Sequence, residues 1–324
     1  MTVVSSLRPT MDEVYAARAR LRGVTVETPL LQLWGSDSIW IKPEVLQPVG
    51  SFKIRGVFNA IAALDPEERA KGVSTVSSGN TAQAVAWAAR KFGVPARAVM
   101  PTTTPDTKVR ATEAYGGTPD LRSFDEAFGY LRHGGYKDFE DTFIHPVANR
   151  DLLAGHGTIA LEIFETMPDV ETVFVPIGGG GLISGISNAL KQLAPNVRMV
   201  GVQPEGCTPV IAGLAAGKSV DVEVHTICDG VAVNFMFPEM YEVLRDLVDD
   251  IVTVPDDDVV RAIRHLALRN KIVAEGAGAL AVAAAVRHGG AGKSIAMISG
   301  GSIDPAKLAE ILTSDYEDIV SLAK

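Results

Sequence analysis

The sequence has 324 residues, enough for two domains or one large one, and its 47% of hydrophobic residues supports substantial buried cores rather than disorder. The formal net charge of -9, from 30 basic and 39 acidic residues, excludes the basic surface of a nucleic-acid-binding protein. The two cysteines, Cys207 and Cys228, make neither a disulfide framework nor a zinc site and fit a reducing compartment. Residues 1–10 lack the pattern of a signal peptide, and no apolar run reaches membrane-spanning length, so we expect a soluble cytoplasmic protein.

Apolar strands alternate with helices along most of the chain. In chain order we expect a helix at 11–22, strand regions from 28 and at 38–42, a helix after 53, a strand at 73–76, a helix at 80–92, a strand at 96–100, helices from 105 and at 124–131, a strand at 142–147, a helix at 151–166 and a strand at 172–177. There follow a helix after 181, a strand at 198–202, helices at 257–269 and 278–286, a strand at 294–299 and a helix at 305–312. This alternation predicts an α/β protein with a mostly parallel sheet covered on both faces.

Lys53 is the first candidate for chemistry. It lies in the stretch 50–56 (GSFKIRG), between the apolar residues Phe52 and Ile54. Most lysines are solvated surface residues, but an apolar pocket would disfavour the ammonium form and lower the lysine pKa. A neutral amine of this kind can hold a carbonyl cofactor as a Schiff base.

Four successive glycines, Gly178, Gly179, Gly180 and Gly181, follow an apolar strand and open a helix. Consecutive backbone N–H groups at a helix N-terminus favour a phosphate group. The run is not a P-loop, because no Gly-Lys-Ser/Thr follows, and it is not a dinucleotide fingerprint, because it lies outside the first βαβ unit. We therefore expect a phosphorylated cofactor here, with a flexible loop as the alternative.

Two further strand ends are rich in serine and glycine. The stretch 77–81 (SSGNT) offers hydroxyls, an amide and helix N-terminal N–H groups, which suit a carboxylate, although an ordinary helix cap would use the same residue types. The stretch 299–302 (SGGS) ends the last strand, and a hydroxyl there could pair with a ring nitrogen. Ligands of open α/β sheets bind beyond the carboxyl ends of the strands, so these stretches and the glycine run could converge on one crevice.

Together the stretches 50–56, 77–80, 178–181 and 299–301 resemble, in order and spacing, the fold-type II pyridoxal-phosphate enzymes, and specifically the branch of threonine/serine dehydratases and serine racemases. The stretches 155–162 (GHGTIALE), 229–233 (DGVAV) and 274–279 (AEGAGA) agree with this resemblance, which covers nearly the whole chain. It implies a tryptophan synthase β-subunit-like α/β fold with two open, twisted, mostly parallel sheets flanked by helices. The cofactor would lie in an interdomain cleft between a large domain, residues 1–70 and 148–324, and a small substrate-side domain, residues 71–147.

The resemblance also implies roles for individual residues. Lys53 would form the Schiff base with pyridoxal 5'-phosphate, and Ser78 would be a second catalytic residue, at the position where racemases place the acid/base of the second face. Asn80 would bind the ring hydroxyl, and Ser299 would face the pyridine nitrogen and keep it largely unprotonated. The full set of cofactor-binding residues implied is Phe52, Lys53, Asn80, Gly178, Gly179, Gly180, Gly181, Leu182, Gly230, Glu275 and Ser299. The substrate would be held by Ser77, Ser78, Asn80 and Thr81.

The sequence departs from the family pattern at several positions. Thr81 stands where family members usually have a histidine, and Ser302 where they usually have an asparagine, so the substrate could differ from that of most members. Gln203 and Pro209 stand where several relatives have acidic ligands of a divalent cation, so we expect no metal site. Polar residues typical of the racemases are replaced by Val147 and Val233, which favours a dehydratase. After the last helix little chain remains, so we expect no regulatory domain of the type found in biosynthetic threonine dehydratases.

The function implied is that of a PLP-dependent dehydratase (ammonia-lyase), a carbon–oxygen lyase that converts a 3-hydroxy amino acid such as L-threonine or L-serine to a 2-oxo acid and ammonia. The alternatives are a serine racemase, or a dehydratase of another 3-hydroxy amino acid such as 3-hydroxyaspartate or phenylserine. An alternative of a different class is a non-catalytic protein that binds PLP or an amino acid. We expect a small amino-acid substrate and a homodimer or homotetramer, with neither nucleic acid nor membrane as a partner.

Overall fold

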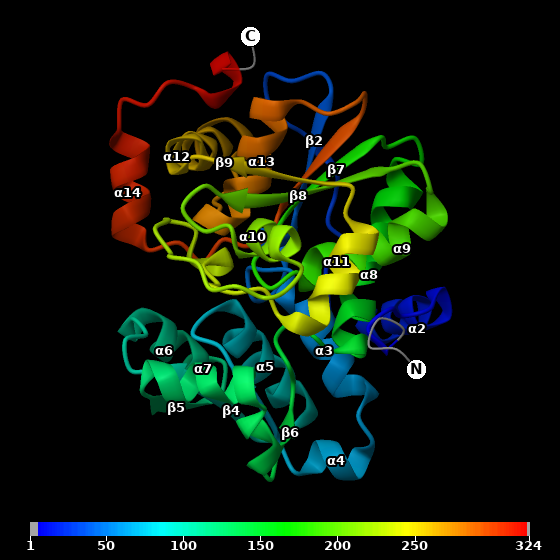
Figure 1. Cartoon of the computed structure of the whole chain (residues 1–324), viewed down its shortest axis with the longest axis vertical. Coiled ribbons are helices and arrows are strands. Elements are labelled where there is room, and N and C mark those ends of the chain that lie inside the picture. Colours follow the sequence, from blue (N-terminus) through cyan, green and yellow to red (C-terminus); the bar gives the residue numbers. More distant parts are fainter. Residues whose placement is uncertain (1–5, 323–324) are drawn as a thin grey trace.

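The computed structural model describes residues 6–322, and its named strands form two separate sheets (Figure 1). The larger sheet has six strands in the order β1-β2-β10-β7-β8-β9, and the smaller has four in the order β5-β4-β3-β6. Within the described residues every pairing of named strands is parallel except that of β1 with β2. The strands are β1 Leu31–Gln32, β2 Ile39–Pro43, β3 Val73–Val76, β4 Ala96–Pro101, β5 Thr118–Arg122, β6 Thr142–Phe143, β7 Thr172–Pro176, β8 Arg198–Pro204, β9 Asp250–Val254 and β10 Ser294–Ile298. The predicted α/β class with mostly parallel sheets is confirmed.

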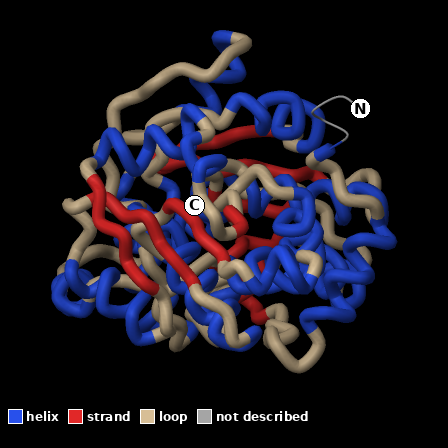
Figure 2. Tube along the Cα trace, turned by 90° about the horizontal axis from the view of Figure 1, so that it is seen from below, coloured by secondary structure: helices blue, strands red, loops and turns tan. Residues whose placement is uncertain are grey.

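Helices flank both sheets and occupy most of the periphery when the molecule is seen from below (Figure 2). The α-helices are α2 Met11–Leu21, α3 Lys53–Ala63, α4 Pro66–Ala70, α5 Asn80–Phe92, α6 Asp106–Ala114, α7 Phe124–His133, α8 Arg150–Thr166, α9 Gly181–Leu193, α10 Pro209–Ala216, α11 Tyr241–Leu247, α12 Asp256–His265, α13 Gly276–His288 and α14 Pro305–Thr313. Short 3₁₀ helices cover η1 Glu44–Leu46, η2 Gly135–Asp138, η3 Asp229–Val231, η4 Pro238–Met240 and η6 Ile319–Leu322, and the π-helix η5 covers Leu266–Asn270. None of the helices in the described part of the chain is long and apolar enough to span a bilayer.

The core of the larger sheet is closed by α13, which is buried from Gly276 to Val286. This stretch contains only glycine, alanine, leucine and valine, and a helix that is apolar all round belongs in the interior. Its N-terminus follows Glu275, so the helix carries that residue to the carboxyl end of the sheet. The same end is reached by the loops after β7 and β10, as expected for parallel strands that run side by side.

The helix that begins at Lys53 packs unusually close to α8. A Cβ atom added at Gly56 would lie 2.7 Å from the Leu152 carbonyl oxygen, and one added at Gly155 would collide with the Arg55 carbonyl oxygen. Glycine on both helices therefore lets the two backbones touch. This contact fixes the distance between α3 and α8 at the level of Lys53.

Among the strands and α-helices of the described residues, five were absent from the sequence prediction, namely β5, β9, α4, α10 and α11. The strands β5 and β9 are each at an edge of their sheet. Pro119 within β5 argues against a central strand and is tolerated because β5 is an edge strand paired only with β4. The predicted strand at 142–147 is shorter than expected, since β6 ends at Phe143.

The strands of the larger sheet come from residues 1–70 and 148–324, and those of the smaller sheet from 71–147. The smaller sheet and its helices form the lower body in Figure 1, and α3 lies where the two bodies meet. Among the residues that the structure describes, two ion pairs connect the bodies, namely Lys108 with Asp229 at 3.3 Å and Arg132 with Asp221. The assignment of these ranges as independent domains stays a prediction.

Candidate active site

One cavity between the two bodies gathers all the residues that the sequence singled out for the site. Its walls include Lys53 with Phe52, the stretch 77–81, the glycine run 178–181 and the end of β10. The remaining predicted residues in the wall are Leu182, Gly230, Glu275 and Ser299. The predicted convergence of three glycine- and serine-rich strand ends is therefore what the structure shows, whereas the role of each residue stays a prediction.

Lys53 is the first residue of α3 and lines this cavity. Its Nζ atom lies 5.0 Å from the centroid of the Phe52 ring, and within the described residues it has no hydrogen-bond partner. Burial lowers the pKa of Lys53 from 10.5 to about 8, and the negative charge of Glu275 opposes this shift only in part. The amine is therefore available in its neutral form at a pH near 8.

Backbone contacts hold the Lys53 loop against the end of β10. The Phe52 N–H donates to the Ser299 carbonyl at 3.0 Å, and the Gly301 N–H donates to the Gly50 carbonyl at 3.0 Å. An isolated antiparallel bridge joins Ser51 to Gly300. These contacts explain why the stretches 50–52 and 299–301, which are far apart in sequence, form one wall of the cavity.

The glycine run forms the turn between β7 and α9, and Gly180 is the N-cap of α9 with φ +94°, a conformation that side chains rarely adopt. No side chain caps this helix, so its first N–H groups face the cavity without a side-chain partner. A Cβ atom at Gly179 would collide with the Val147 side chain and lie 3.0 Å from the Phe237 ring. The run is thus a bare backbone cradle at a helix N-terminus, which fits a phosphate group.

The N-terminus of α5 offers a second anion site. Its N-cap is Gly79, and no side chain caps the helix, so the interpretation of Ser77, Ser78 and Asn80 as ordinary caps is wrong. The hydroxyl of Ser77 instead accepts from the Gly79 N–H at 3.2 Å and shapes the turn. The first N–H groups of α5 are left for a ligand, and their geometry suits a carboxylate.

Asn80 connects the two bodies through a short chain of hydrogen bonds. Its Nδ2 donates to Glu275 Oε1 at 2.8 Å, and its Oδ1 accepts from the Ser302 hydroxyl at 2.8 Å. Burial raises the pKa of Glu275, and the hydrogen bond from Asn80 opposes this shift. Ser302, which departs from the family pattern, therefore fixes the orientation of the Asn80 amide.

Ser299 is buried at the end of β10, where it lines the cavity. Its hydroxyl donates to the Ala277 carbonyl at 3.2 Å, and this bond holds the oxygen at the cavity wall. Two lone pairs of the hydroxyl oxygen remain for a ligand atom. To donate to an unprotonated ring nitrogen, as predicted, the hydroxyl would have to turn its proton from the Ala277 carbonyl toward the cavity.

Several residues in the wall were missed by sequence reasoning. Lys108 on α6 lies at the mouth and pairs with Asp229 across the cleft. The apolar side chains of Phe128 and Leu131 come from α7, and that of Phe237 from the segment before η4. No local motif marks them, because each enters the cavity only through the way the two bodies meet.

Two histidines lie near Lys53 but stay neutral. Burial, together with the charge of Lys53, lowers the pKa of His145 to about 4, and its Nδ1 accepts from the Val147 and Ala148 N–H groups. His156 on α8 is fully buried against the edge of the Phe52 ring, 4.8 Å between centroids, and burial holds its pKa well below the usual value. Both rings act as packing groups around the lysine.

No group of three His, Cys, Asp or Glu residues that could hold a metal ion occurs among residues 6–322. Gln203, at the position where relatives have a metal ligand, is buried, and its Oε1 accepts from the Ile211 N–H at 3.2 Å. Pro209 is the first residue of α10. The two positions thus serve local packing in this chain.

An amine with a lowered pKa, a bare glycine cradle at a helix N-terminus and a second anion site at α5 define a class of protein. They fit a carbonyl-bearing, phosphorylated cofactor and a substrate that carries a carboxylate. The profile of the family described as "Pyridoxal-phosphate dependent enzyme" matches residues 22–300. The chain belongs to this family, its cofactor is pyridoxal 5'-phosphate, and its fold is the predicted fold type II.

Similar proteins support this assignment. The chain is 41% identical to the L-threonine ammonia-lyase of Thermotoga maritima over 94% of this chain and 78% of that protein. It is 37% identical to the catabolic L-threonine dehydratase TdcB of Escherichia coli over 96% of this chain and 98% of that protein. Among solved structures, maize serine racemase superimposes with a TM-score of 0.87 at 34% identity, with 94% of this chain and 96% of that chain covered.

Proposed function

We propose that the protein is a PLP-dependent dehydratase that converts a 3-hydroxy amino acid, such as L-threonine or L-serine, to a 2-oxo acid and ammonia. The observation that carries this proposal is the Lys53 amine, whose pKa is lowered and which shares one cavity with two helix N-termini that lack side-chain caps. Relatives 36–41% identical to the chain are named as threonine ammonia-lyases or dehydratases. The enzyme class is thus that of a carbon–oxygen lyase.

The residues of the cavity divide the work of binding. The N–H groups of 178–181 would hold the cofactor phosphate, and those at the start of α5, with Ser77, Ser78 and Thr81, would hold the substrate carboxylate. Asn80 would orient the cofactor ring, since Glu275 and Ser302 fix its amide. Bound pyridoxal 5'-phosphate supplies a carbonyl that captures amines and an electron sink for the α-carbon.

Lys53 would hold the cofactor at rest and remove the α-proton of the substrate in turnover. A general base works best when its pKa lies near the operating pH, and burial brings the pKa of Lys53 to about 8. The walls of the two bodies would exclude water from the α-carbon. Ser78, on the opposite loop of the cavity, is the proposed second catalytic residue.

Several apolar side chains line the cavity beside the predicted site residues. They are those of Phe128, Leu131, Val147, Val233 and Phe237. The lysine at the rim of the cavity, Lys108, is already paired with a carboxylate. This lining favours a β-carbon that carries an apolar group, as in threonine, over the charged side chain of 3-hydroxyaspartate.

A serine racemase is the second candidate, because the TM-score of 0.87 to maize serine racemase is high and Ser78 lines the cavity. Phenylserine is a further possible substrate for an apolar pocket. A non-catalytic binding protein would retain the cofactor but form neither 2-oxo acid nor the opposite enantiomer. Chiral analysis of serine after incubation separates racemisation from elimination.

We also propose that the protein is a cytoplasmic homo-oligomer. A homodimer or homotetramer would cover exposed apolar side chains such as Trp34, Leu46 and Val273. A cytoplasmic location fits two buried cysteines that are free of a disulfide. A small amino acid is the proposed substrate partner.

The test is a panel of L-threonine, L-serine, 3-hydroxyaspartate and phenylserine, assayed for 2-oxo acid and ammonia with the holoenzyme and with Lys53→Ala. We expect equal amounts of both products from L-threonine with the wild type and none with the variant. Racemised serine without 2-oxo acid would favour the racemase. Bound cofactor without any turnover of the panel would contradict the proposal.

A further inference from the structure

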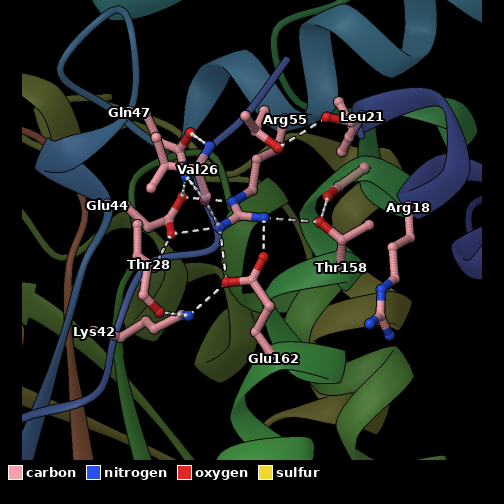
Figure 3. A network of polar contacts seen from close by, with 12 residues as sticks. Arg18, Leu21, Val26, Thr28, Lys42, Glu44, Gln47, Arg55, Thr158 and Glu162 are labelled. Carbon is pink, nitrogen blue, oxygen red and sulfur yellow. Dashed lines mark hydrogen bonds and ion pairs between the residues drawn. The ribbon is translucent and has the colours of Figure 1, made fainter. Parts of the chain in front are cut away.

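A buried cluster of charged residues lies on the side of α3 that faces away from the cavity. We refer to Lys42, Glu44, Arg55 and Glu162 as the Arg55 cluster (Figure 3). Side-chain exposure is 1% for Arg55, 0% for Glu44, 1% for Lys42 and 10% for Glu162. Two cations and two carboxylates make the cluster neutral, so burial does not leave a net charge in the interior.

Arg55 is at the centre of the cluster and uses all its donor atoms. It binds Glu44 through Nε at 2.7 Å and Nη2 at 2.9 Å, and Glu162 through Nη1 at 2.5 Å and Nη2 at 2.9 Å. Nη2 also donates to the Val26 carbonyl at 3.0 Å, and Nη1 to the Thr158 hydroxyl at 3.3 Å. A planar guanidinium can satisfy both carboxylates in this way, whereas a lysine cannot.

The charges of Arg55 and Glu44 are held firmly, whereas burial lowers the pKa of Lys42. Burial of Arg55 would lower its pKa, but Glu44 and Glu162 outweigh it and raise the pKa above its usual value. Burial likewise opposes the ionisation of Glu44, and the nearby Arg55 nonetheless keeps the pKa of Glu44 below its usual range. The pair is therefore fully ionised over the working range of the protein.

The cluster joins the elements that surround Lys53. Glu44 belongs to η1 just before the Lys53 loop, Lys42 to β2 beside β10, and Glu162 to α8, which touches α3 through glycine contacts. Lys42 adds a bond to Glu162 at 2.5 Å. The Arg55 guanidinium, two residues after Lys53 on α3, thus binds η1 through Glu44 and α8 through Glu162. Through Lys42, which also binds Glu162, it is connected to strand β2.

Backbone bonds of Gly50 and Phe52 hold the preceding loop to the end of β10, but the first turn of α3 has no side-chain cap. Its N-cap Phe52 makes no side-chain cap bond, and no acidic residue lies in the first turn to interact with the helix dipole. Buried ion pairs are weak evidence for stability, since apolar residues of similar volume are often equally stable, and a role in fixing geometry is the better attested one. Arg55 is therefore placed to decide where the first turn of α3 lies.

We propose that Arg55 is a positioning residue, and that its clamp on Glu44 and Glu162 holds the Lys53 amine in place in the cavity wall. Residues i and i+2 of a helix lie roughly 200° apart, so Arg55 anchors the side of the turn opposite Lys53. Reactive groups must be held within about 0.5 Å of the productive geometry, and the cluster supplies this precision for the amine. The inference rests on the proposed function only in taking Lys53 as the residue that captures the cofactor.

The test compares Arg55→Lys, which keeps the charge but loses the two-carboxylate clamp, with Arg150→Lys. Arg150 also binds one carboxylate through two nitrogens, with Glu13 at 2.6 and 2.7 Å, but it lies at the start of α8 away from the cavity. In the protein without cofactor, the pH dependence of Lys53 acetylation is followed by mass spectrometry. The rate at which added pyridoxal 5'-phosphate becomes fixed to Lys53 is measured by borohydride trapping.

For Arg55→Lys we expect capture of the cofactor to slow by at least about tenfold, as small displacements of reacting groups cost rate. The acetylation midpoint of Lys53 should rise from about 8 toward 10.5, because a loosened turn admits water to the amine. The charged or titratable neighbours of Lys53, namely Glu275, His145 and His156, are unchanged in the variant. Arg150→Lys should keep the wild-type midpoint and capture rate.

A comparison at equal stability separates an effect of Arg55 on the position of Lys53 from a general loss of folding stability. Arg150→Lys is examined in the urea concentration that gives it the unfolding free energy of Arg55→Lys in buffer. Equal midpoints and equal capture rates in the two matched samples would overturn the inference. If Arg55→Lys does not fold, Glu162→Asp, which keeps the charge but withdraws one carboxylate, takes its place with the same expectations. A wild type that fixes no cofactor on Lys53 would instead contradict the proposed function.

Discussion

Lys53 and Arg55 lie two residues apart on α3, and their surroundings are opposite in kind. The Lys53 amine lines an open cavity with no hydrogen-bond partner among the described residues, and burial lowers its pKa to about 8. The Arg55 guanidinium lies in a closed interior with two carboxylates, a carbonyl and a hydroxyl as partners (Figure 3). One turn of helix thus carries an unsatisfied cation on one side and a fully satisfied cation on the other.

The difference teaches where stability and chemistry reside in this fold. A buried amine without a partner costs free energy and is kept only where a ligand or substrate needs it. A buried pair with all donors used is costly to break, because loss of one partner leaves charges uncompensated. We therefore expect substitutions on the Lys53 side to change activity, and substitutions on the Arg55 side to change folding as well.

The largest expected effect is that of Lys53→Ala. Loss of the general base and of the covalent hold on the cofactor should reduce 2-oxo acid formation by at least about 10³-fold. The urea midpoint of the cofactor-free protein should not fall, since the amine has no partner to lose. The control is Lys91→Ala, at an exposed lysine on α5. A Lys53→Ala protein that retains turnover, or that unfolds in much less urea, would contradict the expectation that this side of α3 serves activity rather than folding.

Arg55→Met probes the other side. Glu44 and Glu162 would keep only Lys42 as a counter-charge, and breaking a buried ion pair typically costs about 3–5 kcal/mol of unfolding free energy. Arg150→Met removes a partly exposed pair and should cost about 1 kcal/mol or less. Urea unfolding of both variants without cofactor gives the comparison. Equal losses of unfolding free energy in the two variants would show that the buried cluster contributes no more to stability than the partly exposed pair.

The sequence predicted the Lys53 side far better than the Arg55 side. The stretches 77–81, 178–181 and 299–302 have local signatures, because glycines and small polar residues at strand ends report backbone geometry directly. The family, the fold class and the cofactor implied by them are confirmed. Arg55 gave only a weak signal, a charge among Ile54, Val57 and Phe58, and its partner Glu162 lies 107 residues away. Such pairs depend on tertiary packing, which residue patterns do not encode.

The same limit explains the missed residues at the mouth. Lys108 and Asp229 are 121 residues apart and meet only because the two bodies close on each other. Ser302 looked like a departure from the family pattern, but its hydroxyl orients Asn80 in this chain. The sequence therefore predicted residues that the structure gathers in one cavity, whereas the other residues of its wall needed the structure.

Gly179→Ala should weaken cofactor binding without touching the Arg55 cluster. The new methyl group would collide with Val147 and lie 3.0 Å from Phe237 in the cradle. Overpacking of this kind costs about 1–3 kcal/mol, or roughly a tenfold to hundredfold loss of affinity. Fluorescence titration with pyridoxal 5'-phosphate measures it. The double variant Gly179→Ala, Val147→Ala should recover part of the loss, and an unchanged affinity in the single variant would mean that the phosphate is bound elsewhere.

The smallest expected effect concerns the charge that faces Lys53. Burial lowers the pKa of the amine to about 8, and the Glu275 carboxylate raises it again in part by stabilising the ammonium form. Glu275→Gln removes that charge and should move the acetylation midpoint of Lys53 below 8 by less than about one pH unit, because the carboxylate opposes the effect of burial only in part. The glutamine can still accept from Asn80, so the amide chain to Ser302 is kept. An upward shift would mean that water entering near residue 275, rather than the lost charge, sets the pKa of Lys53. An unchanged midpoint would mean that the Glu275 carboxyl group, whose pKa burial raises, is already neutral when Lys53 titrates.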